Sequence, residues 1–176
     1  KKRIKADKGR FWAGDNVSKY LEEGDKQKLI EELAPKFDSV IDSLAYTGIL
    51  TIRSELKSVC SHHHQPVSGI AYIGILAAEK LIGLSKYTRI AQWCARRGTL
   101  QEELCNNIAR EIMKATGSND VGVYIQATHG CCENRGIMAY SSLTQTTVLK
   151  GAFKDDKGTK QEFFDNIKLQ QEFAPR

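Results

Sequence analysis

All four histidines of this 176-residue chain lie close to cysteines, in two separate clusters. The clusters are Cys60 with His62, His63 and His64, and His129 with Cys131 and Cys132. Thiolate and imidazole are ligands that Zn²⁺ favours in proteins. Cys60 and His63 have the spacing of a short chelating turn, and Cys131 would supply a third ligand from the other cluster. Three protein ligands leave one coordination position open, which is typical of a catalytic zinc site.

Two further histidines, His62 and His129, would then lie beside the metal as proton carriers, because imidazole titrates near neutral pH. The alternative is a surface histidine turn and two buried thiols that never meet. A single Cys-x-x-His spacing is a weak signal, and it is the second cluster that favours the metal site.

Cations gather where a helix is predicted to begin. Ser85, Lys86 and Arg89 stand together there, and the spacing of the two cations places both on one helix face. A helix N-terminus with cations beside it is suited to bind an anion, although composition alone favours the alternative, a solvated first turn. Arg135 is a further cation, four residues after Cys131.

Gln101 and Glu102 open the next predicted helix. A carboxylate at position 102 is suited to accept two N–H donors from the edge of a guanine base. Because Thr99 stands three residues earlier, a capping-box role for Glu102 is an equally good interpretation.

Hydrophobic periodicity predicts the elements that position these residues. An amphipathic helix is expected from residue 25 to about residue 44, interrupted at Pro35, with Leu29, Leu33, Phe37, Val40 and Leu44 on one face. Strands are predicted over 48–54, 70–76, 121–127 and 142–148, and the turn 60–65 joins the first two into a hairpin. Helices are predicted over 85–97, from residue 99 to the turn at 117–120, and over 159–173.

The first of these helices is expected to begin at Ser85 as N-cap and to bury Ile90, Trp93 and Cys94. The second is expected to bury a stripe formed by Leu100, Leu104, Ile108 and Ile112.

This order predicts an α+β fold, in which a ββααββ antiparallel sheet carries two helices on one face and follows an N-terminal helix. Residues 1–45 would form the N-terminal arm and helix, and residues 46–176 the catalytic domain. A four-stranded sheet alone leaves two edges exposed, and a symmetric oligomer that joins the edges is a natural solution.

Composition restricts the class of protein further. Apolar residues make up 41% of the chain and charged residues 27%, which is ordinary for a globular protein. The net charge of +5 fits an anionic small molecule as well as a nucleic acid. No apolar run is long enough for a membrane helix, and no secretory signal is found in the sequence. Five cysteines, an odd number, favour reduced thiols and a cytoplasmic location.

Taken together, these motifs resemble GTP cyclohydrolase I, a family with the tunnelling fold. The resemblance runs from about residue 47 to residue 167. It rests on Cys60-Ser61-His62-His63, Ile82-Gly83-Leu84-Ser85-Lys86 with Arg89, Leu100-Gln101-Glu102, Ala127-Thr128-His129-Gly130-Cys131, Arg135-Gly136 and the threonine-rich 144–147. The segment 10–16 and the Cys-Ser-His-His-His turn look most like versions carried by cyanophages.

The resemblance implies roles for individual residues. By position, Cys60, His63 and Cys131 match the zinc ligands, and His62 and His129 match the catalytic histidines. Gln101 and Glu102 match the pair that recognises guanine, and Ser85, Lys86, Arg89 and Arg135 match residues that hold the substrate and its triphosphate. Cys94 and Cys105 are expected to be core residues of the helices.

The resemblance also implies a reaction. Zinc-activated water would attack C8 of GTP, release it as formate and lead to 7,8-dihydroneopterin triphosphate, a precursor of pterins and folate or of deazaguanines. The family's site lies between subunits of a homodecamer that closes a β-barrel. Ser61 replaces the family's usual glutamate, and a segment with a Thr-Pro-x-Arg-like motif is absent between residues 45 and 46.

Two other functions compete with this interpretation. One is the tunnelling-fold nitrile reductase of deazaguanine metabolism, against which the histidine pairs argue. The other is a non-catalytic, zinc-stabilised oligomer that binds guanine nucleotides. Nucleic acid is a poor partner, because aromatic and basic residues do not alternate on any predicted strand.

Overall fold

The structure is a computed structural model that describes residues 40–42, 46–77 and 80–173. The predicted N-terminal arm and most of the helix predicted over 25–44 lie outside the described residues. Residues 40–42 are the part of this predicted helix that the structure describes, and there the prediction is wrong. They form strand β1 (Val40–Asp42), which pairs antiparallel with β4 (Lys80–Ile82) in a small separate sheet.

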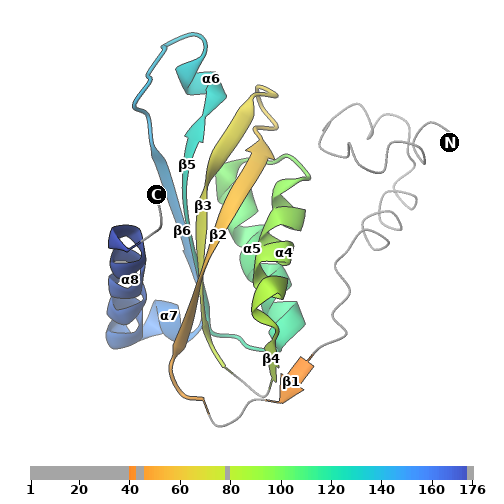
Figure 1. Ribbon diagram of the computed structural model, residues 1–176, viewed down its shortest axis with the longest axis vertical. Coiled ribbons are helices and arrows are strands. Elements are labelled where there is room, and N and C mark those ends of the chain that lie inside the picture. Colours follow the sequence, from red (N-terminus) through yellow and green to blue (C-terminus); the bar gives the residue numbers. More distant parts are fainter. Residues whose placement is uncertain (1–39, 43–45, 78–79, 174–176) are drawn as a thin grey trace, which may run out of the picture.

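The main sheet has four antiparallel strands in the order β2-β3-β5-β6 (Figure 1). Its strands are β2 (Ile49–Val59), β3 (Pro66–Leu76), β5 (Val121–His129) and β6 (Thr144–Leu149). The predicted ββααββ order is therefore confirmed, although β2 and β3 are longer than the apolar runs indicated. Strands β2 and β6 form the two edges of the sheet.

Register brings the two histidine clusters to the same end of the sheet. Strand β2 pairs with β3 along its whole length, up to Val59 opposite Pro66. On the other side of β3, Val67 lies opposite His129, the last residue of β5. The turn after β2 therefore lies next to the end of β5, where the short helix α6 (Gly130–Glu133) begins.

Two helices, α4 (Leu84–Ala95) and α5 (Gln101–Thr116), cover one face of the sheet, as the sequence predicts (Figure 1). The core between them and the sheet is apolar and fully buried at Ile73, Ile108 and Val123. Of the predicted stripe on α5, Leu104, Ile108 and Ile112 are buried, but Leu100 is 48% exposed because it precedes the first turn of the helix.

The predicted caps of both helices are wrong. Gly83 is the N-cap of α4, so Ser85 lies within the first turn and makes no capping bond. Leu100 is the N-cap of α5, and the hydroxyl of Thr99 bonds to Glu103 rather than forming a box with Glu102.

The opposite face of the sheet is covered by helix α7 (Ala152–Asp155) and helix α8 (Lys157–Glu172) (Figure 1). Helix α8 confirms the helix predicted over 159–173, but the sequence did not predict which face of the sheet it covers. Phe153 and Phe163 meet edge to face, with ring centroids 5.3 Å apart, and both are completely buried. The two rings pack against Gly74 and Gly122, which are paired across β3 and β5. Glycine is needed at both positions because a larger side chain would occupy the space that the rings fill.

Among the described helices, none combines the length and the apolar character that crossing a membrane requires.

Candidate metal centre and active site

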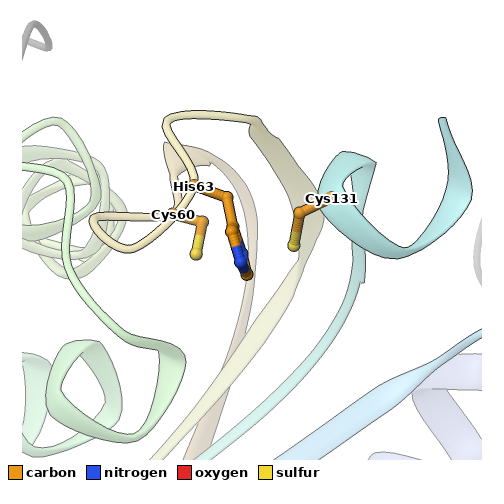
Figure 2. A group of neighbouring side chains, drawn as sticks. All are labelled: Cys60, His63 and Cys131. Atoms are coloured by element: carbon orange, nitrogen blue, oxygen red, sulfur yellow. The ribbon is translucent and has the colours of Figure 1, made fainter. Parts of the chain in front are cut away.

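Three predicted ligands converge at the end of the sheet. The side-chain ligand atoms of Cys60, His63 and Cys131 all lie within 4.8 Å of one another (Figure 2). Cys60 and His63 come from the turn between β2 and β3, and Cys131 comes from α6, so two separate segments build one cluster (Figure 2). The alternative, in which the thiols never meet, is excluded by this geometry.

The turn itself holds Cys60 and His63 in place. The amide of Cys60 donates to the carbonyl oxygen of Gln65 at 2.9 Å, and the amide of His64 donates to the carbonyl oxygen of Cys60 at 2.8 Å. His64 takes a left-handed backbone conformation with φ of 53°, which reverses the chain before β3 begins at Pro66. Because both ends of the turn are paired strands, the ligands stand on a rigid support.

The donor set fits a zinc ion. The Nδ1 atom of His63 is buried and has no hydrogen-bond partner among the described residues. Burial lowers the pKa of His63, and the nearby His62 and Arg135 lower it further. Burial also raises the pKa of Cys131, with Cys132 and Cys60 adding to the effect. Two thiols and an imidazole with an unpaired nitrogen are groups that a cation would satisfy.

His62 and Arg135 flank this cluster. The His62 ring lies 4.0 Å from the His63 ring, centroid to centroid, and is tilted by 37°. His62 is exposed, and so is Arg135, which is close enough to affect the charge of His63. Both side chains can therefore reach a molecule that approaches the cluster from solvent.

His129 is tied to the first residue of α5. Its Nε2 lies 2.7 Å from Oε1 of Gln101, whose side chain is only 4% exposed. Burial lowers the pKa of His129, while the carboxylates of Glu102 and Glu133 oppose this shift. Glu102 is itself exposed at the start of α5 and within electrostatic reach of His129.

The side chain of Gln101 contacts the sheet as well as His129. Its side chain fills the junction between α5 and the sheet instead of facing solvent. Sequence spacing offered no sign of this contact, because its partners on β5 and β6 lie 24 to 45 residues further along the chain. The two side chains therefore differ in their surroundings: that of Glu102 is exposed, and that of Gln101 is buried and hydrogen-bonded within the protein.

Ser85, Lys86 and Arg89 lie away from the metal cluster of the same chain. They belong to the first turns of α4, near β4, at the other end of the sheet (Figure 1). The opposite end of α4 is the one nearer the cluster. Its last residue, Ala95, accepts a 2.7 Å hydrogen bond from the hydroxyl of Ser58, which stands on β2 two residues before Cys60. A helix rises about 1.5 Å per residue, which separates the two ends of α4 by roughly 16 Å.

Cys94 and Cys105 are core residues, as predicted. Cys94 and Cys105 are buried between helices and sheet, and burial raises their pKa to about 11 and about 12. Thiols held protonated in this way are packing residues rather than ligands. Cys132 lies beside Cys131 in α6.

Comparisons with known proteins identify the family that the chain resembles. The family model described as GTP cyclohydrolase I matches residues 16–168. The chain is 38% identical over 149 residues to "GTP cyclohydrolase 1" of Pseudoalteromonas translucida, covering 85% of this chain and 79% of the relative. It is 38% identical over 140 residues to the protein of that name from Flavobacterium johnsoniae, covering 79% of this chain and 62% of the relative. For the protein of that name from Gloeobacter violaceus, the identity is 36% over 150 residues, covering 85% of this chain and 68% of the relative.

Proposed function

This chain belongs to the GTP cyclohydrolase I family, and from that premise we propose that it is a zinc-dependent enzyme that converts GTP and water to 7,8-dihydroneopterin triphosphate and formate. The observation that supports the proposal most is the convergence of Cys60, His63 and Cys131 beside two further histidines. The match to the family extends over most of the chain, and the chain spans 62% of the length of the Flavobacterium relative.

Cys60, His63 and Cys131 would hold the zinc ion. When bound, zinc acts as a Lewis acid and makes water a nucleophile at neutral pH. Three protein ligands are the number found at catalytic rather than structural zinc sites.

His62 and His129 would move protons at this centre. His62 is exposed and its ring lies next to that of His63, so it would carry protons between the metal centre and solvent. His129 is held by a short hydrogen bond, so it can meet the substrate in one fixed orientation. Two proton carriers suit this reaction, because opening the imidazole ring of GTP and then releasing C8 as formate both require proton transfer.

Glu102 would select guanine. Its exposed carboxylate stands at the start of α5, close enough to His129 to affect its charge. A guanine edge offers two N–H donors to a carboxylate, whereas adenine offers no such pair, so adenine would leave the carboxylate without donors.

The triphosphate would be held by a second copy of the chain. Arg135 lies beside the metal cluster, but Ser85, Lys86 and Arg89 are at the far end of α4 in the same chain. A site that uses all of them needs α4 of a neighbouring copy. The sheet edges β2 and β6, which have no further partner among the described strands, offer a way to join copies, in a ring or a decamer. A hollow of about 460 Å³ lies along β2 and α4, and the charged residues that line it are Glu55, Lys57 and Arg96.

In its cellular setting the product would supply pterin and folate synthesis or deazaguanine synthesis. The enzyme would act in the cytoplasm, or in the host cytoplasm if a phage encodes it. A downstream enzyme would consume the pterin triphosphate.

The proposal is tested by GTP turnover on metal-analysed protein, with formate and pterin followed together. Cys131→Ala is the control, because it removes one ligand. We expect both products from the zinc-loaded protein and neither from the variant. Neither product from folded protein that contains zinc would instead favour a nucleotide-binding oligomer, and cyano-deazaguanine-dependent NADPH oxidation would favour a nitrile reductase.

A further inference from the structure

The side chain of Gln101 is oriented by the strands it touches. Its Nε2 lies 3.1 Å from the carbonyl oxygen of Thr144, 3.2 Å from the hydroxyl of Thr146 and 3.4 Å from the carbonyl oxygen of Ile125. Carbonyl oxygens accept hydrogen bonds and never donate them, so the amide nitrogen must be the atom that faces them. The amide oxygen is thereby left facing His129.

This orientation decides which nitrogen of His129 carries a proton. Oε1 of Gln101 can only accept, and it lies 2.7 Å from Nε2 of His129. A neutral imidazole has one N–H and one lone pair, so the bond requires the N–H at Nε2 and leaves the lone pair at Nδ1. We propose that Gln101 is a positioning residue that fixes this tautomer of His129, so that Nδ1 is the nitrogen that accepts and returns a proton during catalysis.

Burial makes the arrangement firm. Gln101 is 4% exposed, and an amide with several partners in a buried site cannot turn without leaving polar groups unpaired. The chain thus uses the start of α5 for two tasks. Glu102 faces outward to the ligand, and Gln101 faces inward to the proton carrier. The consequence for catalysis rests on the proposed function, but the tautomer itself does not.

The tautomer can be read by nitrogen NMR on the zinc-loaded protein with ¹⁵N-labelled histidine, since the chain has only four histidines. The His129 signals are those that disappear in His129→Asn. At about pH 8, above the ordinary histidine pKa, we expect a protonated Nε2 and an unprotonated Nδ1. In Gln101→Met, which keeps the size but not the hydrogen bonds, we expect a mixture of tautomers. A proton on Nδ1 in the unaltered protein, or unchanged signals in Gln101→Met, would overturn the proposal.

Kinetics separate positioning from guanine recognition. We expect Gln101→Met to lower kcat at least about tenfold with KM for GTP changed less than about threefold, because proton transfer is affected and binding is not. A raised KM with unchanged kcat would mean that Gln101 recognises the base, and would refute the proposal.

Cys105→Ala is the matched structural control. Cys105 lies one turn further along the same helix, and its Sγ lies 3.4 Å from the carbonyl oxygen of Val123 on β5. We expect this variant to lower Tm without changing the His129 signals or kcat. An equal loss of kcat in Cys105→Ala would show that Gln101 acts only through stability. If the zinc-loaded protein turns over no GTP at all, the proposed function fails, while the nitrogen spectrum still decides the tautomer.

Discussion

Replacing Gly74 with alanine should destabilise the layer formed by α7 and α8. A methyl group at this position would lie 2.6 Å from two ring carbons of Phe163 and 2.9 Å from Phe153, whereas ordinary contacts are 3.4–4 Å. The rings would have to move by about 0.8 Å or more. Both are completely buried and packed edge to face, so neither can move without displacing the other.

The size of the effect follows from two opposing contributions. Overpacking of a well-filled core costs about 1–3 kcal/mol. Alanine also restricts the unfolded chain, which returns about 0.4–1 kcal/mol where the backbone accepts it. We therefore expect the free energy of unfolding to fall by about 1–2 kcal/mol. At Gly122 the nearest ring carbon is 3.0 Å away, so Gly122→Ala should cost less.

Urea unfolding followed by circular dichroism, at fixed protein and zinc concentrations, measures these differences. Adding Phe163→Leu to Gly74→Ala should recover part of the loss, because the smaller side chain makes room for the methyl group. If Gly74→Ala is as stable as the unaltered protein, or costs less than Gly122→Ala, the reasoning from ring contact is refuted.

Three further changes have definite expected outcomes. Cys131→Ser should reduce bound zinc at least about tenfold by metal analysis, whereas the buried Cys94→Ser should retain it; equal retention by both would exclude Cys131 as a ligand. Mixing Cys131→Ser protein with Lys86→Ala protein should restore part of the GTP turnover that each lacks, because some sites then combine intact residues from two copies; complete failure after verified subunit exchange would place the whole site in one chain. Asp156→Ala should lower Tm by roughly 2–4 °C, since Asp156 caps α8 by accepting from the amide of Thr159 at 2.6 Å. That bond lowers the pKa of Asp156, so its stabilisation is complete above about pH 4 and is lost as pH falls through the lowered pKa; a Tm difference that grows on acidification would contradict this.

Sequence periodicity predicted the elements whose pattern is local. The alternation over 121–127 became β5, and the spacing of Leu104, Ile108 and Ile112 became the buried face of α5. Strand β2 extends further than predicted because its last residues include the exposed Glu55 and Lys57, which carry no apolar signal but pair fully with β3.

Features that depend on distant pairing could not be predicted. Phe153 and Phe163 pack on the sheet against Gly74 and Gly122, which belong to strands that are far apart along the chain. At the candidate site, residue types were enough to predict that Cys60, His63 and Cys131 come together, because thiols and imidazoles in two clusters are typical of a zinc site. The engagement of Gln101 was not visible, since an amide shows no preference until its neighbours are known.

If Cys60, His63 and Cys131 hold zinc as proposed, the distance along the chain between them has a consequence for how the protein matures. His63 and Cys131 are brought together only after β3 has paired with β5, and α4 and α5 lie in the chain between those strands. In an unfolded chain, Cys60 and His63 stay close together but Cys131 is held near them by no structure, so the chain would hold a metal ion more weakly. A metal ion that binds only the folded state shifts the folding equilibrium toward that state. Free zinc would therefore stabilise those chains in which β3 and β5 have paired correctly. Starvation for zinc would then reduce the amount of assembled protein as well as the activity of each molecule.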